Sequence, residues 1–160
     1  MKRSEILLLA QPLAERLYQV AYSIIPDDLQ AEQIVIDGFN AFLLKESRKL
    51  TATHFDSQNK KEVLVQRKNI FKMILKNICD IGLRRSAQLN DQLGIDQPAE
   101  FKSYFSLDAK VRLIMRLRYD LQLNTSDIEE ILGFARHEVI EKIHNGRFLL
   151  MNDLNKEAVV

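Results

Sequence analysis

The segment from residue 127 to residue 147 constrains the fold of this chain most. Its apolar residues follow helical spacing up to Gly133, and a second helical pattern begins about three residues later, with Val139 and Ile143 on its inner side. Glycine readily adopts the left-handed backbone that a sharp turn between two helices requires. The segment therefore predicts a helix-turn-helix.

The charge of this motif is unusual for one that reads DNA. The second helix of a helix-turn-helix lies in the major groove, where Lys and Arg neutralise phosphates. Residues 123–150 hold three basic and five acidic side chains, a balance of −2, and Glu138 and Glu141 fall in the first two turns of the second helix. Strong phosphate-driven affinity is not expected from this segment alone.

The rest of the chain also predicts helices. Among 160 residues there are five Gly and three Pro, too few for a turn-rich β protein, and the hydrophobic content of 46% fits one ordinary domain or two small ones. Apolar residues recur at helical spacing in several segments. In the first of these, the apolar side consists of Leu13, Leu17, Val20, Ala21 and Ile24.

The boundaries between the predicted helices are marked by polar and turn-forming residues. Pro12 fits the first turn of the first helix, which ends near Pro26, and Asp27 or Asp28 can cap the next. Residues 51–61 predict a loop, followed by a third helix over about 63–85. We expect an all-α fold with two small helical domains, residues 1–86 and 107–160, joined by a linker over residues 87–106, in which Phe101, Tyr104 and Phe105 are candidates for docking on a neighbour.

The single cysteine and the lack of a long apolar run bear on where the protein works. Cys79 cannot form an internal disulfide, which favours a reducing compartment, and its place within the third helix predicts a small buried side chain. The apolar run 6–10 is too short to cross a bilayer. We expect a cytoplasmic protein without membrane insertion.

The third helix carries the best functional signal in the residues themselves. Residues 60–85 hold eight Lys or Arg and two acids, a local balance of +6. Such a face can neutralise phosphates, and Asn69 and Asn77 can hydrogen-bond bases or sugar. The alternative is an ordinary solvated helix surface. At four-residue intervals, one stripe of this helix holds Lys68, Lys72, Lys76, Asp80 and Arg84.

No enzyme site is visible in the sequence. His54, His137 and His144 are scattered and lack the cysteine or carboxylate partners of a zinc site. No glycine-rich phosphate loop occurs, and no Ser or Cys stands in a recognisable nucleophile setting. We therefore expect no catalytic residue, no metal and no cofactor.

Three segments of the first half carry a resemblance to a known family: residues 17–25, residues 30–39, and residues 71–77 with Arg84 and Arg85. Together they resemble region 2 of an RNA polymerase sigma factor of the compact extracytoplasmic-function type. Residues 17–25 resemble the opening helix of that region, and residues 30–39 resemble the acidic segment that docks on the polymerase clamp helices. Residues 71–77, followed by Arg84 and Arg85, resemble the helix that melts and holds the downstream promoter element. A stacking platform for unpaired bases could come from His54 and Phe55 in the loop.

The second half resembles region 4, which grips the upstream promoter element, through residues 117–119, residues 131–133, Val139, His144 and Arg147. The resemblance implies a monomer when free, with core RNA polymerase, promoter DNA and an anti-sigma factor as partners. It implies polymerase binding by Glu32 and Asp37. It implies DNA binding by Lys68, Asn69, Lys72, Lys76, Asn77, Arg84, Arg85, Arg136, His137, Lys142 and Arg147.

The acids of the helix-turn-helix leave two other functions open. Glu129 stands where this motif usually needs a small side chain, so Glu129 should tilt outward or the two helices should cross more loosely. Glu138 and Glu141 also suit a sigma mimic, which occupies an anti-sigma factor or another protein without reading promoters. A conventional helix-turn-helix repressor is a third possibility and requires a two-fold dimer.

Overall fold

The chain is all-helical wherever its structure is described, as the sequence predicted. A computed structural model describes the backbone of residues 3–50, 60–89 and 102–157, and the side chains of residues 13–45, 65, 67–89 and 102–153. These ranges hold seven helices and no strand: α1 (Arg3–Ile24), α2 (Asp28–Leu50), α3 (Lys60–Leu89), α4 (Lys102–Phe105), α5 (Ala109–Tyr119), α6 (Thr125–Leu132) and α7 (Arg136–Glu157). None of the described helices is long and apolar enough to span a membrane.

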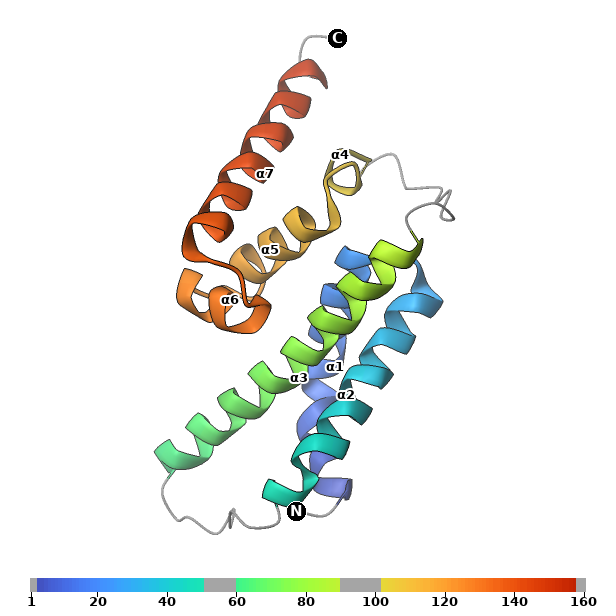
Figure 1. Ribbon diagram of the computed structural model, residues 1–160, viewed down its shortest axis with the longest axis vertical. Coiled ribbons are helices and arrows are strands. Elements are labelled where there is room, and N and C mark those ends of the chain that lie inside the picture. The colour runs from blue at the N-terminus through green and yellow to red at the C-terminus, as the bar shows by residue number, and fades with distance from the viewer. Residues whose placement is uncertain (1–2, 51–59, 90–101, 158–160) are drawn as a thin grey trace.

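Helices α1, α2 and α3 form one bundle (Figure 1). Helix α1 begins at Arg3, upstream of Pro12, so the prediction that Pro12 starts the helix is wrong. The predicted apolar side of α1 is confirmed, because Leu17, Val20, Ala21 and Ile24 are buried. Asp27 caps α2, since its Oδ1 accepts the backbone N–H of Gln30 at 2.8 Å.

Glycine lets α3 approach its neighbours closely within this bundle. A Cβ placed on Gly38 of α2 would lie 2.4 Å from Cγ1 of Ile78, and one placed on Gly82 would lie 2.7 Å from Cδ1 of Ile24. At Gly38 the Ile78 backbone nitrogen would also lie 3.3 Å from the added Cβ, so a larger side chain there would strain the contact between α2 and α3, whereas at Gly82 a shift of the Ile24 side chain could make room. Cys79 is buried on α3, as predicted.

Helices α6 and α7 form the predicted helix-turn-helix, and α5 packs against both. Helix α6 ends at Gly133, which adopts a left-handed conformation with φ 68°, and α7 begins three residues later at Arg136. Val139 is buried and Ile143 is half-buried, which confirms the predicted inner side of α7. In Figure 1, α7 extends beyond α5 and carries the C-terminus away from the bundle.

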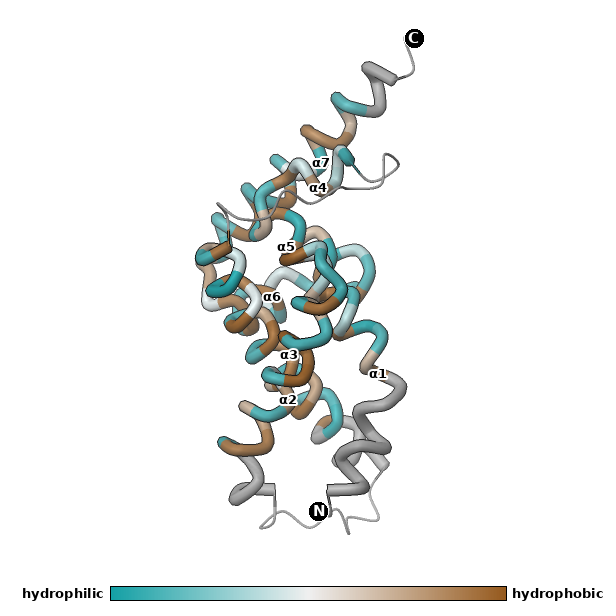
Figure 2. The backbone as a smooth tube through the Cα atoms, turned by 90° about the vertical axis from the view of Figure 1, so that its right-hand side faces the viewer, coloured by the Kyte–Doolittle hydropathy of each residue, from teal (hydrophilic) through white to brown (hydrophobic). Residues whose placement is uncertain are grey.

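One hydrophobic core joins the two predicted domains. Buried residues of α1, α2 and α3 belong to the same cluster as Leu113 and Ile114 of α5 and as Ile128 and Ile131 of α6. Figure 2 shows apolar stretches of α3 and α6 in the middle of the molecule, where the two groups of helices meet. The first and second halves are therefore packed against each other rather than separated.

A buried arginine links the two halves by hydrogen bonds. Arg112 of α5 is only 8% exposed, and its guanidinium donates from Nε to the carbonyl of Ser23 at 2.7 Å and from Nη2 to that of Ile24 at 2.8 Å. Its Nη1 donates to the carbonyls of Phe105 and Leu107. Arg112 thus caps the C-terminal end of α1, where helical carbonyls lack partners within the helix. Burial lowers the pKa of Arg112.

The segment predicted as a linker contains α4, and two of its aromatic residues dock. Phe105 packs edge-on against Tyr22 of α1, with ring centroids 5.9 Å apart. The hydroxyl of Tyr104 donates to the carbonyl of Arg112 at 3.1 Å. Docking is therefore confirmed for Tyr104 and Phe105, whereas Phe101 lies outside the described residues.

Candidate nucleic-acid interface

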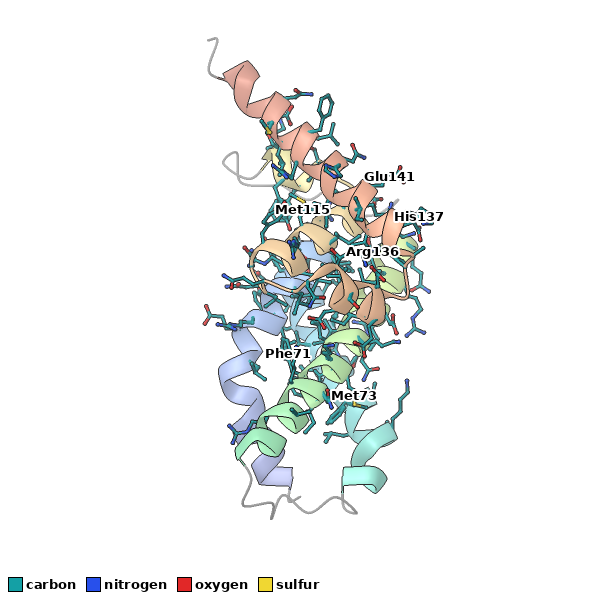
Figure 3. All side chains as sticks on the ribbon, turned by 90° about the vertical axis from the view of Figure 1, so that its left-hand side faces the viewer. Phe71, Met73, Met115, Arg136, His137 and Glu141 are labelled. Carbon is teal, nitrogen blue, oxygen red and sulfur yellow. The ribbon has the colours of Figure 1, made fainter. Side chains whose placement is uncertain are left out.

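The outer face of α3 presents several of the predicted DNA-binding side chains to solvent. Asn69, Lys76 and Arg84 are all exposed, and their spacing of seven and eight residues puts them on one side of the helix. Met73 lies between them and is 36% exposed, whereas Phe71 projects from the opposite side of α3 (Figure 3). We name Asn69, Met73, Lys76 and Arg84 the α3 outer face, and the exposed acid Asp80 lies on the same side, one turn from both Lys76 and Arg84. Lys68 is exposed and Asn77 is half-buried.

Lys72 does not share this exposure, because α6 covers it. Its Nζ lies 2.5 Å from Oδ1 of Asp127 and 2.8 Å from Oε2 of Glu130, and its side chain is 17% exposed. The three residues form what we call the Lys72 clasp. The hydrogen bonds from Lys72 lower the pKa of Asp127, and the two acids raise the pKa of Lys72.

The clasp should make the contact between α3 and α6 sensitive to acid. A carboxylate whose pKa is lower in the folded than in the unfolded protein stabilises the fold above its unfolded pKa, about 3.9 for Asp, and this contribution disappears as the pH falls through the lowered pKa. Urea unfolding should therefore show a larger loss of stability from about pH 5 to about pH 3 in the wild type than in Asp127→Asn. Parallel pH profiles in the two proteins would contradict this role of Asp127.

Arg85 and Asp37, which were predicted to bind different partners, form an ion pair with each other. Asp37 lies on α2 and Arg85 on α3, and both side chains are about one-third exposed. Asp37 also accepts a hydrogen bond at 2.9 Å from Nε2 of Gln33. The pair ties α2 to α3, so a structural role stands beside the predicted binding role of each residue.

The outer face of α2 carries exposed apolar side chains that the sequence analysis missed. Leu29 is 77% exposed, Ile36 52% and Leu44 82%. Their spacing places them on one side of α2 together with the exposed Glu32. We name Leu29, Glu32, Ile36 and Leu44 the α2 outer face. The signal was present in the sequence, because helical spacing puts these three apolar residues on the side away from the buried Ala31, Ile34 and Phe42.

The predicted DNA-binding residues of α7 do not all face solvent. Arg136, His137 and Arg147 are exposed, whereas Lys142 is half-buried. Figure 3 shows Arg136 and His137 at the start of α7, with Glu141 one turn further along the helix. The exposed side of α7 thus holds two cations, a histidine and an acid.

Two acids of the helix-turn-helix, Glu138 and Glu129, are partly buried, and only Glu138 has a hydrogen bond there that helps to form the motif. Glu138 is half-buried, and its Oε2 accepts the backbone N–H of Ala135 at 3.2 Å, which satisfies a donor at the start of α7. Glu129 is half-buried too, and its Oε1 is buried without a hydrogen-bond partner among the described residues. Of the two alternatives expected for Glu129, the outward tilt is not found for Oε1, and burying this oxygen carries a desolvation cost.

The loop residues that were candidates for stacking on bases, His54 and Phe55, lie outside the described residues. No protein-family model matches this chain, and no curated protein matches it either. The α2 outer face, the α3 outer face and the exposed side of α7 are therefore the candidate binding surfaces.

Proposed function

We propose that this chain is a divergent sigma factor of the extracytoplasmic-function type, which binds core RNA polymerase and promoter DNA to direct transcription initiation in the cytoplasm. In this proposal the first half acts as region 2, the second half acts as region 4, and the free protein is a monomer. The observation that supports it most is the α3 outer face, where two cations and an amide are exposed on the helix that resembles the promoter-melting helix.

The α2 outer face suits a protein partner. Three exposed apolar side chains on one helix bury favourable area when a second surface covers them. The exposed Glu32 beside them can pair with a basic residue of that surface. In the proposal this surface is the polymerase clamp, and two residues of the α2 outer face, Glu32 and Ile36, fall within residues 30–39, the segment that resembles the clamp-docking helix.

The role of the α3 outer face can be tested with single-stranded promoter DNA. We expect Lys76→Gln/Arg84→Gln to weaken binding for all sequences and to reduce the slope of log affinity against log salt by about 1.4, because each lost phosphate contact removes about 0.7. The control is Lys45→Gln/Lys102→Gln, which removes the same charge from exposed positions elsewhere. Equal slopes in the two double variants would count against the α3 outer face as the binding surface.

Reconstituted transcription tests the proposed function as a whole. The purified chain should associate with core RNA polymerase and direct initiation at a promoter from the cell of origin. Ile36→Asp should lower the association, because it places a charge on the α2 outer face, while Glu15→Gln on the exposed side of α1 should leave it unchanged. A chain that neither joins the core enzyme nor directs initiation at any promoter would refute the proposal.

The second candidate function is a sigma mimic that binds an anti-sigma factor or another protein. The outer side of α7 favours it, because Ile140 is 40% exposed and Phe148 63% exposed beside the acidic Glu141. Such a surface suits a protein partner better than phosphates. The mimic predicts tight protein binding without salt-sensitive DNA binding, so the salt titration above separates the two functions.

A further inference from the structure

Helix α6 supplies two carboxylates to the basic side of α3. Asp127 and Glu130 are three residues apart on α6, so both point to the same neighbour, and both contact the ammonium of Lys72. Lys68, one turn earlier on α3, adds its positive charge near Asp127 and contributes to lowering the pKa of that acid. The acids therefore lie where the basic residues of α3 come closest to the second half of the molecule.

The oxygens around Lys72 carry negative charge, as the phosphate oxygens of a nucleic acid do. Lysine binds phosphate as a point charge, through short contacts between its ammonium and anionic oxygens. The Lys72 ammonium already has two carboxylate oxygens within 2.8 Å. A phosphate that contacts Lys72 would therefore have to replace these carboxylates.

The apolar contact beneath the clasp determines how strongly α6 competes. Partly exposed ion pairs contribute little to stability, so the clasp alone would open readily. Ile128 and Ile131 on the same helix are buried in the shared core with Leu75 and Cys79 of α3. Displacing α6 must therefore expose apolar surface, which makes the closed state the stable one in the free protein.

We propose that α6 is an internal competitor of nucleic acid on α3, in which Asp127 and Glu130 hold Lys72 until a nucleic acid displaces them. This inference rests on the proposed function, because Lys72 borders the α3 outer face. The basic residues of α3 thereby form two groups, which differ in whether nucleic acid can reach them in the free protein. Lys76 and Arg84 are open to nucleic acid in the free protein, whereas Lys72 joins them only after α6 moves.

A double-mutant cycle with a labelled polythymidine oligonucleotide tests the competition. Asp127→Asn/Glu130→Gln should raise the affinity about 10-fold in the wild-type background, within the usual range of coupling between two sites. In a Lys72→Gln background the same two substitutions should change the affinity far less, since only net charge then differs. Equal gains in both backgrounds would overturn the inference, because they would show a general charge effect. Glu15→Gln, at an exposed position of α1, measures the gain from removing one acid that takes no part in the clasp.

Amide hydrogen exchange separates failure of this inference from failure of the proposed function. In the absence of nucleic acid, the backbone amides of α6 should exchange faster in Asp127→Asn/Glu130→Gln than in the wild type, while those of α2 should not change. Adding the oligonucleotide to the wild type should also accelerate exchange in α6. If no variant binds the oligonucleotide, the DNA-binding function fails and the internal competition with it. If binding occurs while α6 stays equally protected, only the competition fails.

Discussion

Replacing Arg112 with methionine is expected to lower the free energy of unfolding by about 4 kcal/mol, because each buried carbonyl left without its donor costs about 1–3 kcal/mol and some regain water. The guanidinium holds carbonyls at the end of α1 and others just before α5. Methionine preserves much of the side-chain volume, so the loss reports on hydrogen bonds rather than on a cavity. In a chain of this size the melting temperature should fall by about 10 °C.

Arg118→Met provides the matched control for this measurement. Arg118 lies on the same helix but is exposed, and its Nη1 makes a single hydrogen bond, to the carbonyl of Leu123 at 2.9 Å. Its replacement should cost about 1 kcal/mol or less. Similar losses in the two variants would mean that burial of Arg112 does not fasten the two halves.

The second large effect is expected at the crossing of α2 and α3. Gly38→Val should destabilise the protein by about 3 kcal/mol, because overpacking of a tight core typically costs 1–3 kcal/mol and occasionally more. Its Cβ would meet Cγ1 of Ile78 at 2.4 Å and the Ile78 backbone nitrogen at 3.3 Å. Chemical denaturation of the variant measures this loss directly.

Two further variants identify the cause of that loss. Asn40→Val, at an exposed position of the same helix, tests the effect of a β-branched residue alone and should stay within about 0.5 kcal/mol of the wild type. In an Ile78→Ala background Gly38→Val should cost less, because the nearest carbon is gone. An unchanged cost in that background would show that contact with Ile78 is not the source of the strain.

The sequence predicted which sides of the helices are buried, because a single helix records this in its periodicity. The apolar side of α1 and the turn at Gly133 follow from local spacing and backbone preference, and the structure confirms both. The start of α1 could not be placed in this way. Proline is favoured in a first helical turn, but here the helix already begins at Arg3.

The contacts between distant residues could not be predicted, because periodicity does not say which helix a side chain will meet. In the sequence, Lys72 is one member of a stripe that is either solvated or phosphate-binding. In the structure, it forms ion pairs with Asp127 and Glu130 of α6. Arg112 was only one of several basic residues on its helix, and its burial depends on carbonyls 88 and 89 residues away. Charge alone gave no sign that these two cations differ from their neighbours.

The cap that Arg112 places on α1 can form only late in the synthesis of the chain. The carbonyl of Ile24 is made 88 residues before the guanidinium that satisfies it. At ordinary rates of translation, about 5–20 residues per second, the first helix waits roughly 4–18 s for its partner. During that interval the end of α1 and the apolar residues beside it are open to water and to other proteins. The first half of the chain therefore lacks the Arg112 hydrogen bonds to Ser23 and Ile24 until the second half has been synthesised.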